Sequence, residues 1–548
     1  MKHSVIRVSQ HLTQLPYHHR PLSHSTRIIT TSHSIAKTYN RGLSSTFSPS
    51  LYTYTRSRCF SLSSALPSNV KMNAPLHKKP INLLRGWPSP SLLPAAALSA
   101  AAVKTLADPA IYVPGLQYGP DPGYQPLRES LARWLSAFYP AANPAPPSAT
   151  GAATSDPGNN GRHQHHPPDA RRICVTGGAS QNLACILQSF TDPLYTKNIW
   201  MVAPCYFLAC PIFADAGFDG RLKSVPEDDD GIDIEYLRKG LEAAGEGGDE
   251  RFKQAKKRKL YRHIIYLVPT CSNPTGKTMS LTRRYELVAL ARQHDALIIS
   301  DDVYDFLQWP LTCSDTPPGL YTPEMRLPRL VDIDRALGVP DASFGNAVSN
   351  GSFSKIVGPG VRTGWAEGSP AFAYGLSQTG STCSGGAPSQ LSAMLVAELL
   401  ESGELQRQLD EETRPALARR HRAMMKAIAE YIQQPLGNGV VVRESALKGA
   451  GVYGGYFVWF SLPEGMSSRE AAVRAKETEG LVIGHGAQFE VHGDEKSARF
   501  DREIRLCFSW EPEEDVVEGV KRLGAVLKAM REGVQWKSAG GLDVDNVK

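Results

Sequence analysis

Short apolar runs alternate with helical segments over most of this chain, and that alternation restricts the possible fold more than any other feature. Four apolar runs, rich in β-branched residues, fit strands: 173–176, 198–202, 263–268 and 296–300. Helical segments separate them; Leu287, Leu290 and Ala291, for example, recur at helical spacing before the fourth run. Because strands that are apolar throughout need cover on both faces, we predict an α/β fold with a mostly parallel, doubly covered sheet.

A smaller domain is predicted after this sheet. A long helix is expected around residues 387–430, and residues 455–460 (GYFVWF) then fit a strand. Strands and helices alternate from there to the end of the chain, as in a smaller α+β domain. We therefore predict a large domain at 116–390 and a small domain at 391–548, with an N-terminal segment at 72–115 that packs on the small domain.

The positive charge of the chain is concentrated at its N-terminal end. Of the 548 residues 41% are apolar and 21% charged, the ordinary balance of a soluble enzyme, and the formal net charge is +6. Residues 1–71 contain nine Lys and Arg, and no Asp or Glu precedes Asp108, which leaves 51 basic and 54 acidic residues in the rest. This near-neutral body argues against nucleic-acid binding. No apolar run reaches the roughly 18 residues of a membrane span, so no membrane partner is expected either.

Residues 1–71 are rich in Ser, Thr, His and Arg, a composition that cannot build a packed core. It fits an organelle transit peptide, and residues 58–63 (RCFSLS) resemble the cleavage pattern of mitochondrial presequences. A mitochondrial location is therefore expected. The alternative is translation from Met72, which would give a cytoplasmic protein.

Three Pro-, Gly- or charge-rich stretches interrupt the body, at 140–170, 244–260 and 311–346, and are interpreted as surface insertions of unknown role. The HQHH run at 163–166 and the KKRK run at 256–259 fit solvated loops better than metal or nucleic-acid sites. The nine cysteines form no CxxC pair and have no His pair at zinc-ligand spacing. The sequence predicts buried, reduced thiols and no metal site.

The stretch with the most chemistry is residues 352–365, which read SFSKIVGPGVRTGW. A lysine that attacks an aldehyde must be partly desolvated, so that a useful fraction of its amine is neutral. Hydroxyls before Lys355 and the guanidinium of Arg362 after it can bind a dianionic phosphate, and the glycines let the backbone approach that anion.

This stretch resembles the Schiff-base signature of the class I/II aminotransferases, which are fold type I pyridoxal-phosphate enzymes. It is most similar to the branch that contains 2-aminoadipate, kynurenine and aromatic aminotransferases, and that branch also includes the catalytic half of MocR-type regulators. The resemblance, from about Ile81 to Leu527, implies pyridoxal 5′-phosphate as the cofactor and Lys355 as its Schiff-base lysine.

Three further motifs follow the order of this family. In the SNPTG run at 272–276 the resemblance directs the Asn273 amide to the oxygen on the cofactor ring. At the end of the next strand it places Asp301 against the pyridine nitrogen and Tyr304 on the ring oxygen, with Asp302 as the rival acid. A carboxylate there keeps the nitrogen protonated, so that the ring withdraws electrons from the substrate.

The remaining cofactor contacts are also implied by resemblance. In the TGGASQ run at 176–181 a glycine turn precedes a helix, whose N-terminus attracts anions. The expected phosphate contacts are the Ala179 backbone, the Ser180 hydroxyl, Ser352 and Arg362, and Tyr206 is expected to stack on the pyridine ring. Tyr118 matches a tyrosine that reaches the phosphate of a neighbouring subunit, which implies a homodimer with shared active sites.

Substrate contacts are expected at three positions. Arg505, on a late strand, matches the arginine that forks the substrate α-carboxylate, and Asn273 lies with it. Gly86 resembles the N-terminal segment that closes over the substrate, and the adjacent Arg85 is a candidate for a second selectivity arginine.

The function predicted from these motifs is transamination, in which an L-amino acid (2-aminoadipate, aromatic or similar) gives its amino group to a 2-oxo acid such as 2-oxoglutarate. Lys355, Asp301 and Tyr304 are the expected catalytic residues, with the Lys355 amine as general acid and base. One alternative is a lyase or decarboxylase with the same cofactor set. The other is a MocR-like sensor without catalysis, although residues 1–80 lack the helical pattern of the winged helix that such regulators carry.

Overall fold

The computed structural model describes residues 78–144, 166–245, 258–311, 321–386 and 388–538. The predicted transit peptide, Met72 and the central parts of the three insertions lie outside these residues. The chain from Pro75 to Lys548 forms one compact unit by its internal contacts. The predicted boundary at residue 390 stays a prediction.

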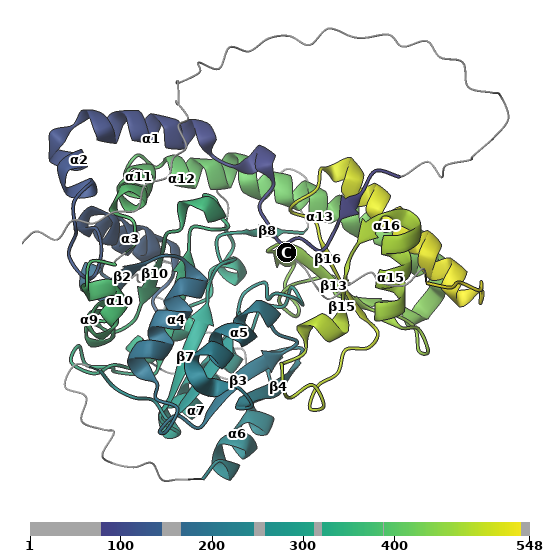
Figure 1. The fold of residues 1–548 in the computed structure, drawn as a ribbon, viewed down its shortest axis with the longest axis horizontal. Helices are drawn as coiled ribbons and strands as arrows, with labels where there is room; N and C mark the ends of the chain where they lie inside the picture. The colour runs from purple at the N-terminus through teal and green to yellow at the C-terminus, as the bar shows by residue number, and fades with distance from the viewer. Residues whose placement is uncertain (1–77, 145–165, 246–257, 312–320, 387, 539–548) are drawn as a thin grey trace, which may run out of the picture. The chain divides into compact units, whose positions relative to one another are not determined.

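A mixed sheet of eight strands organises the first part of this unit (Figure 1). In spatial order its strands are β2 (Ile173–Thr176), β10 (Gly364–Glu367), β9 (Ala347–Ser352), β7 (Ala296–Asp301), β6 (His263–Leu267), β3 (Asn198–Ala203), β4 (Leu222–Asp228) and β5 (Gly231–Ile232). From β9 to β4 each neighbouring pair is parallel, whereas β10 is antiparallel to β9 and β2. The expected mostly parallel α/β sheet is confirmed.

Helices bury both faces of this sheet. Successive side chains of each strand point to opposite sides, so strands that are apolar throughout present an apolar surface on each face. On β3, Ile199 and Met201 pack with Leu183 of α4, whereas Trp200 and Val202 belong to a second core on the other face. The helices of the first face are α4 (Ala179–Phe190), α5 (Cys210–Phe213) and α9 (Pro370–Ser377). Those of the second face are α6 (Ile234–Ala243), α7 (Leu281–Gln293) and α8 (Leu330–Ala336).

Short polar side chains fix where several of these helices begin. Ser280 accepts a hydrogen bond from the Arg283 backbone N–H at the start of α7, and Ser369 does the same at the start of α9. Such caps satisfy N–H groups that have no partner within the helix and typically stabilise it by about 1 kcal/mol.

A second, antiparallel sheet lies in the C-terminal part. Its strands are, in order, β11 (Val441–Val442), β13 (Phe457–Ser461), β16 (Glu503–Cys507) and β15 (Gly484–His485). The helices α13 (Arg414–Ile428) and α15 (Ser468–Glu479) both pack on α16 (Glu513–Arg531) beside it (Figure 1). The two parts are also joined directly, because β8 (Gln308–Pro310) pairs with β12 (Val452–Gly454).

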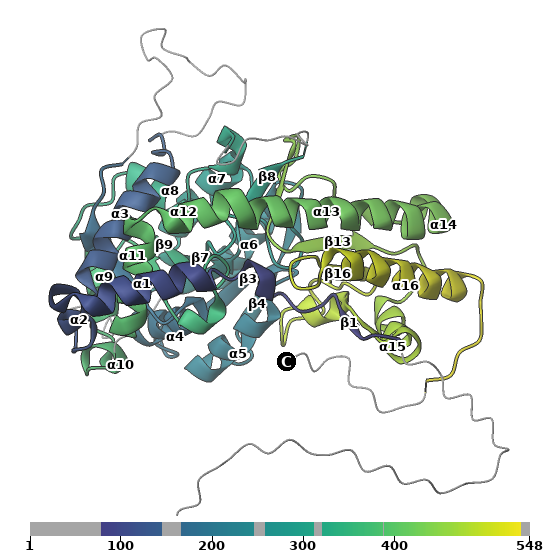
Figure 2. The same ribbon diagram turned by 90° about the horizontal axis from the view of Figure 1, so that it is seen from above.

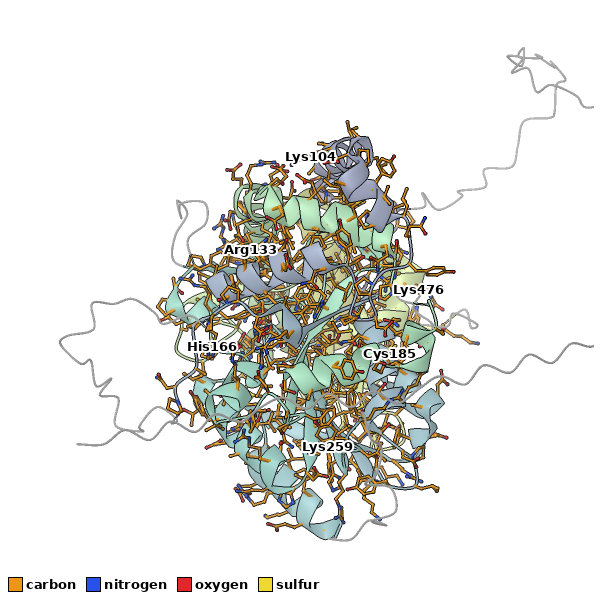
Figure 3. All side chains as sticks on the ribbon, turned by 90° about the vertical axis from the view of Figure 1, so that its left-hand side faces the viewer. Lys104, Arg133, His166, Cys185, Lys259 and Lys476 are labelled. Atoms are coloured by element: carbon orange, nitrogen blue, oxygen red, sulfur yellow. The ribbon has the colours of Figure 1, made fainter. Side chains whose placement is uncertain are left out.

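The N-terminal segment contacts both parts of the unit. Its strand β1 (Ile81–Asn82) pairs in parallel with β14 (Leu481–Val482) of the C-terminal part. Its helices α1 (Ala95–Ala107) and α2 (Pro109–Gly115) lie against α11 (Gln390–Glu401), which also packs on α3 (Gln125–Phe138). Ion pairs join these helices to α11, between Lys104 of α1 and Glu398 and between Arg133 of α3 and Glu401. Figure 3 labels Lys104 and Arg133.

The long helix expected around 387–430 is wrong as a single element. Helix α11 ends at Glu401, and Gly403 then takes a positive φ of 74°, which favours glycine and interrupts the helix. A second helical stretch begins at Glu404 with α12 (Glu404–Arg407) and continues through α13 to α14 (Gln434–Leu436); Figure 2 shows these three in one line. The break separates a helix that packs on α1 and α3 from one that packs on α16.

The third predicted insertion is partly regular. Its described residues include helix α8, whose Leu330 and Ile333 are buried in the core beneath the sheet. The Pro-rich composition around this helix concealed it.

Seven of the nine cysteines lie in the described part, and six of these are buried; Cys383 is exposed. Among the residues that the structure describes, no helix has the length and apolar character that a membrane crossing needs.

Candidate active site

The Lys355 side chain lies just beyond the end of β9, where the N-terminal segment covers it. Its Nζ donates a hydrogen bond to the Gly86 carbonyl oxygen at 2.8 Å, and the Tyr456 hydroxyl donates to the Lys355 carbonyl at 3.0 Å. Burial lowers the pKa of Lys355 to about 8, with Arg505 acting in the same direction and Asp301 opposing it. A lysine with this pKa keeps a sizeable neutral fraction near neutral pH, as an amine that attacks an aldehyde requires.

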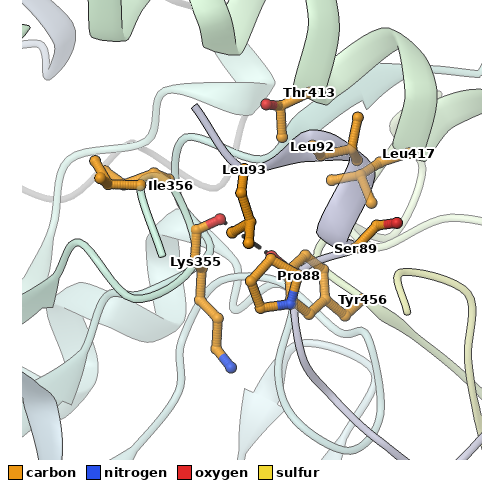
Figure 4. Close-up of a pocket in the computed structure, with 10 residues that line it drawn as sticks. Pro88, Ser89, Leu92, Leu93, Lys355, Ile356, Thr413, Leu417 and Tyr456 are labelled. Carbon is orange, nitrogen blue, oxygen red and sulfur yellow. Dashed lines mark hydrogen bonds between the residues drawn. The ribbon is translucent and has the colours of Figure 1, made fainter. Parts of the chain in front are cut away.

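A small pocket lies behind Lys355, on the side of its backbone. It is lined by Pro88, Ser89, Leu92, Leu93, Ile356, Val357, Thr413, Leu417 and Tyr456. Figure 4 shows the Lys355 amine pointing away from Leu92, Leu93 and Thr413. These contacts fix the lysine backbone, while the amine is turned away from them to Gly86, near the charges of Asp301 and Arg505.

Asp301 is the last residue of β7 and is held by both neighbouring strands. Tyr266 of β6 donates its hydroxyl to Asp301 Oδ2 at 2.8 Å, and Asn350 of β9 donates its amide to Oδ1 at 3.2 Å. Burial raises the pKa of Asp301 to about 6, while the Tyr266 hydrogen bond and the Lys355 charge act to lower it. The carboxyl group is thus mostly ionised at neutral pH.

The rival acid, Asp302, has different surroundings. Its carboxylate accepts hydrogen bonds from the Ser300 and Ser349 hydroxyls, the latter at 2.5 Å. Burial, with the charge of Asp305 acting in the same direction, raises its pKa to about 8. Because adjacent residues at a strand end point to opposite sides, Asp301 and not Asp302 interacts with Lys355.

The N-terminus of α4 forms an anion cradle with the turn after Lys355. Gly178, directly before α4, has a φ of +98°, and a Cβ atom there would lie 2.8 Å from Arg362 Nη2. Arg362 donates to the Gly177 carbonyl at 2.9 Å and to the Pro359 carbonyl at 2.7 Å. A helix N-terminus beside a guanidinium group suits a phosphate.

The other predicted phosphate contacts border this cradle. Ala179 and the exposed Ser180 open helix α4, so that their backbone N–H groups lack partners within the helix. Ser352 ends β9, three residues before Lys355, and its hydroxyl donates to the Ser354 oxygen at 2.9 Å.

Arg505, on β16 of the small sheet, is buried and points to the SNPTG turn. Its Nη1 donates to Asn273 Oδ1 at 2.7 Å, and Nη2 donates to the Leu84 carbonyl. Its guanidinium lies 4.1 Å from the Phe457 ring centre and 4.6 Å from that of Phe489. Its Nε has no hydrogen-bond partner among the described residues, which leaves a buried donor for an anion.

Two tyrosines border the same space. Tyr206 is partly buried, and burial raises its pKa to about 12, with Asp301 acting in the same direction. Tyr304 is 2% exposed and lies edge-on to Tyr456, with ring centres 5.4 Å apart. Burial also raises the pKa of Tyr304, so its hydroxyl stays protonated as a hydrogen-bond donor.

Tyr118 is 87% exposed, and its ring lies against Gly385, away from Lys355 in the same chain. Every other predicted site residue belongs to the surroundings of Lys355 or to the cradle beside it. Sequence reasoning missed three residues that hold Asp301 and its neighbours, namely Tyr266, Asn350 and Asn182. The available signal was polarity inside buried strands and at the start of a helix, where apolar residues are usual.

Comparison with known proteins identifies this arrangement. A family model described as "Aminotransferase class I and II" matches residues 96–523. The chain belongs to this family. It is an aminotransferase of fold type I, and its cofactor is pyridoxal 5′-phosphate. The site fits that cofactor, because a buried amine, an anion cradle and a mostly ionised carboxylate occur together around one space.

Individual relatives cover about four fifths of this aminotransferase. An uncharacterized protein of Saccharomyces cerevisiae is 34% identical over 82% of this chain and 97% of its own length. An aromatic-amino-acid aminotransferase of Thermococcus litoralis is 28% identical over 82% of this chain and 88% of its own. The crystal structure of LysN, an alpha-aminoadipate aminotransferase of Thermus thermophilus complexed with N-(5′-phosphopyridoxyl)-L-leucine, has a TM-score of 0.60 and 25% identity, covering 83% of this chain and 94% of LysN.

Proposed function

We propose that this aminotransferase moves the amino group of 2-aminoadipate or an aromatic L-amino acid to 2-oxoglutarate. The observation that carries the proposal is that the Lys355 amine, bound to the Gly86 carbonyl, lies near two buried charged groups, the Asp301 carboxylate and the Arg505 guanidinium, which both act on its pKa. The names of the relatives from Thermococcus and Thermus support the two classes of amino donor.

Lys355 is proposed to move the proton at the substrate α-carbon. Pyridoxal phosphate, when bound, supplies an aldehyde for amino groups and a ring that withdraws electrons from that carbon. The Lys355 amine, with a pKa of about 8, is suited both to accept and to return a proton near neutral pH.

Asp301 is proposed to face the pyridine nitrogen, and Asn273 and Tyr304 the ring oxygen. A carboxyl with a pKa of about 6 presents a negative charge at neutral pH, and the Tyr304 hydroxyl remains a donor. Tyr206 is proposed to stack on the ring. We assign the phosphate to the cradle described above, with these contacts: Ala179, Ser180, Ser352 and Arg362.

Arg505 is proposed to bind the substrate α-carboxylate, with Asn273 and the Gly86 segment beside it. The free Nε and the planar guanidinium support a bidentate contact, which lysine cannot make. Because the aromatic rings of Phe457 and Phe489 exclude water around the guanidinium, the contact is strengthened.

Arg85 is proposed to receive the second carboxylate of 2-aminoadipate. It precedes Gly86, and its guanidinium lies 4.7 Å from the Trp87 ring centre and 5.0 Å from that of Trp510. Among the described residues it forms no ion pair, so its charge is available. The two indoles would also favour an aromatic donor, which is why both classes are retained.

A panel of amino donors against 2-oxoglutarate tests these proposals. We expect turnover with 2-aminoadipate and with aromatic amino acids. Arg85→Gln should lower kcat/KM for 2-aminoadipate about tenfold, which is the effect of losing one charge pair that partial burial strengthens. The kcat/KM for tyrosine should be unchanged. Product formed without an acceptor in large excess over the enzyme would instead indicate a lyase or decarboxylase, because a transaminase stops after one equivalent of oxo acid, and no reaction with any donor would favour the sensor.

A homodimer with Tyr118 at the partner's phosphate is also proposed. Exposed apolar residues support it, since monomers rarely expose large apolar patches: Leu116 and Leu391 line the same hollow as Tyr118, and Val103, Leu106 and Val113 are exposed on α1 and α2. Light scattering should give twice the mass of the chain, and Tyr118→Phe should weaken cofactor binding. A monomer with full activity would contradict both.

Mitochondrial import of residues 1–71 is a further proposal, supported by their nine basic and no acidic residues. Residues 1–71 fused to a fluorescent protein should direct it to mitochondria. Cytoplasmic fluorescence, with a native N-terminus at Met72, would contradict import.

A further inference from the structure

The Asn350 side chain joins two parts of the candidate site that lie far apart in the sequence. Asn350 is 1% exposed and lies directly beside Asp301, its partner in the pairing of β9 with β7. Its Nδ2 donates to Asp301 Oδ1 at 3.2 Å and to the Ala179 carbonyl at 3.1 Å. Its Oδ1 accepts from Asn182 Nδ2 at 2.7 Å. Both ends of the amide are therefore used.

Packing alone does not explain an asparagine at this position. Strand β9 is buried along its whole length, and its Val348 belongs to the apolar core on the face of α4. A buried amide is costly unless it is hydrogen-bonded, and a leucine of similar size would fill the same volume without that requirement. The amide is explained by its partners, which belong to the cofactor site on both sides.

The two partners anchor opposite ends of that site. Ala179 is the first residue of α4, whose N-terminus forms the anion cradle, and Asp301 is the acid at the end of β7. We propose that Asn350 is a positioning residue that holds the Asp301 carboxylate at a set distance and angle from the phosphate cradle. This inference rests on the proposed roles of Ala179 and Asp301.

The position of Asp301 is fixed only when both carboxylate oxygens have a donor. Tyr266 supplies the donor to Oδ2, and without Asn350 the carboxylate could rotate about this single hydrogen bond. Asn182, through the Asn350 oxygen, keeps the amide from turning its nitrogen away. A rigid cofactor that contacts both ends would then bind less well, because one end could be satisfied only by moving the other.

The test is cofactor binding by the apoprotein of the full chain. Asn350→Leu keeps the size and removes the donors, and it should raise the Kd for pyridoxal phosphate about tenfold, the lower end of the effect of losing an outer-shell partner. Asn182→Leu should raise it less. Ser349→Ala is the matched control, since it also removes buried side-chain hydrogen bonds of β9, but to Asp302 and Arg329, and it should leave the Kd unchanged.

A double-mutant cycle separates positioning from general damage to the fold. In an Asp301→Asn background, Asn350→Leu should change the Kd less than twofold, because there is no charge left to position. The pH dependence of the visible absorbance band of the bound cofactor should differ from that of the unmodified protein in Asn350→Leu. In Ser349→Ala this pH dependence should be unchanged. Should Asn350→Leu fail to fold, Asn350→Asp, which keeps the size and replaces the donor with an acceptor, is measured instead and should bind even more weakly.

An unchanged Kd in Asn350→Leu, or equal losses in the two Asp301 backgrounds, would overturn the inference. Failure of the proposed roles is distinguishable, because Asp301→Asn alone would then leave the Kd of the otherwise unmodified chain unchanged. Failure of the proposed donor classes would appear only in the panel of amino donors and would leave these Kd values as they are.

Discussion

The Lys355 amine and the Gly86 carbonyl oxygen, 269 positions apart in the chain, are joined by a 2.8 Å hydrogen bond. The N-terminal segment therefore reaches over the candidate active site and contacts its reactive group. Its course is fixed by the small sheet, because the Cys507 N–H donates to the Leu83 carbonyl and the Ser509 hydroxyl to the Trp87 carbonyl.

Gly86→Ala should disturb this cover. A Cβ atom at Gly86 would lie 2.6 Å from the Phe457 ring, so the segment or the ring must move. We expect KM for the amino donor to rise about tenfold with a smaller change in kcat. A displacement of the segment by about 1 Å weakens substrate binding more than it affects the groups that react. Steady-state kinetics measure this, and Gly380→Ala, where a Cβ atom meets nothing within 4 Å, is the control. Equal kinetics of the two variants would contradict the prediction.

The capture of pyridoxal phosphate by the apoprotein should accelerate as the pH rises through about 8. Only the neutral amine attacks the aldehyde, and burial has lowered the pKa of Lys355 from its ordinary 10.5 to about 8. The Lys355 amine is therefore mostly charged below pH 7 and mostly neutral above pH 9. Stopped-flow absorbance between pH 6 and 10 gives the rate. In Lys355→Ala the fast phase should vanish, and a rate that rises only near pH 10.5 would count against a desolvated lysine.

Arg505→Lys should lower kcat/KM for every amino donor about 100-fold. Lysine keeps the charge, but it loses the fork that pairs with a carboxylate and the hydrogen bond to Asn273. A loss of this size corresponds to about 2.7 kcal/mol. Arg499→Lys is the matched control, because this arginine is exposed and pairs only with Asp501 among the described residues. A loss confined to one donor would place Arg505 at the substrate side chain and not at the α-carboxylate.

His421 should make the folded protein sensitive to mild acid. It is 2% exposed and stacks on Tyr453 with ring centres 3.9 Å apart, and neither ring nitrogen has a hydrogen-bond partner among the described residues. Burial lowers its pKa from 6.5 to about 3, so below pH 6.5 the unfolded chain gains a proton that the folded chain does not. The free energy of unfolding is therefore highest above about pH 6.5. It falls as the pH drops toward 3, by about 2 kcal/mol between pH 7 and 5.

Urea unfolding of His421→Phe at pH 7 and pH 5 measures this contribution. The variant should lose about 2 kcal/mol less than the unmodified protein over that interval, since phenylalanine keeps the stacking and cannot take a proton. His492→Gln, at an exposed position, should behave like the unmodified protein. The same acid sensitivity in His421→Phe would show that other groups are responsible.

Four strands of the large sheet were predictable because their signal is local. The run 173–176 coincides with β2, and the other three predicted strands differ from β3, β6 and β7 by one residue at their ends. A continuous apolar, β-branched run is extended wherever it is buried, so its neighbours need not be known. The motif around Lys355 was equally predictable from the sequence, because Lys355 and Arg362 lie within one short turn and their spacing is therefore a local feature.

Which residues meet in space was decided by the tertiary structure. The separation of Asp301 from Asp302 depends on which side of β7 each faces, and the support of Asp301 by Tyr266 and Asn350 depends on the neighbours of β7 in the sheet. An asparagine within a strand has no local pattern that reveals its partners, because hydrogen bonds across a sheet join residues far apart in sequence. The sequence by itself determined most of the strands and the reactive groups; only the packing of the elements decided the burial of Lys355 and the orientation of Asp301, since both result from contacts with distant segments.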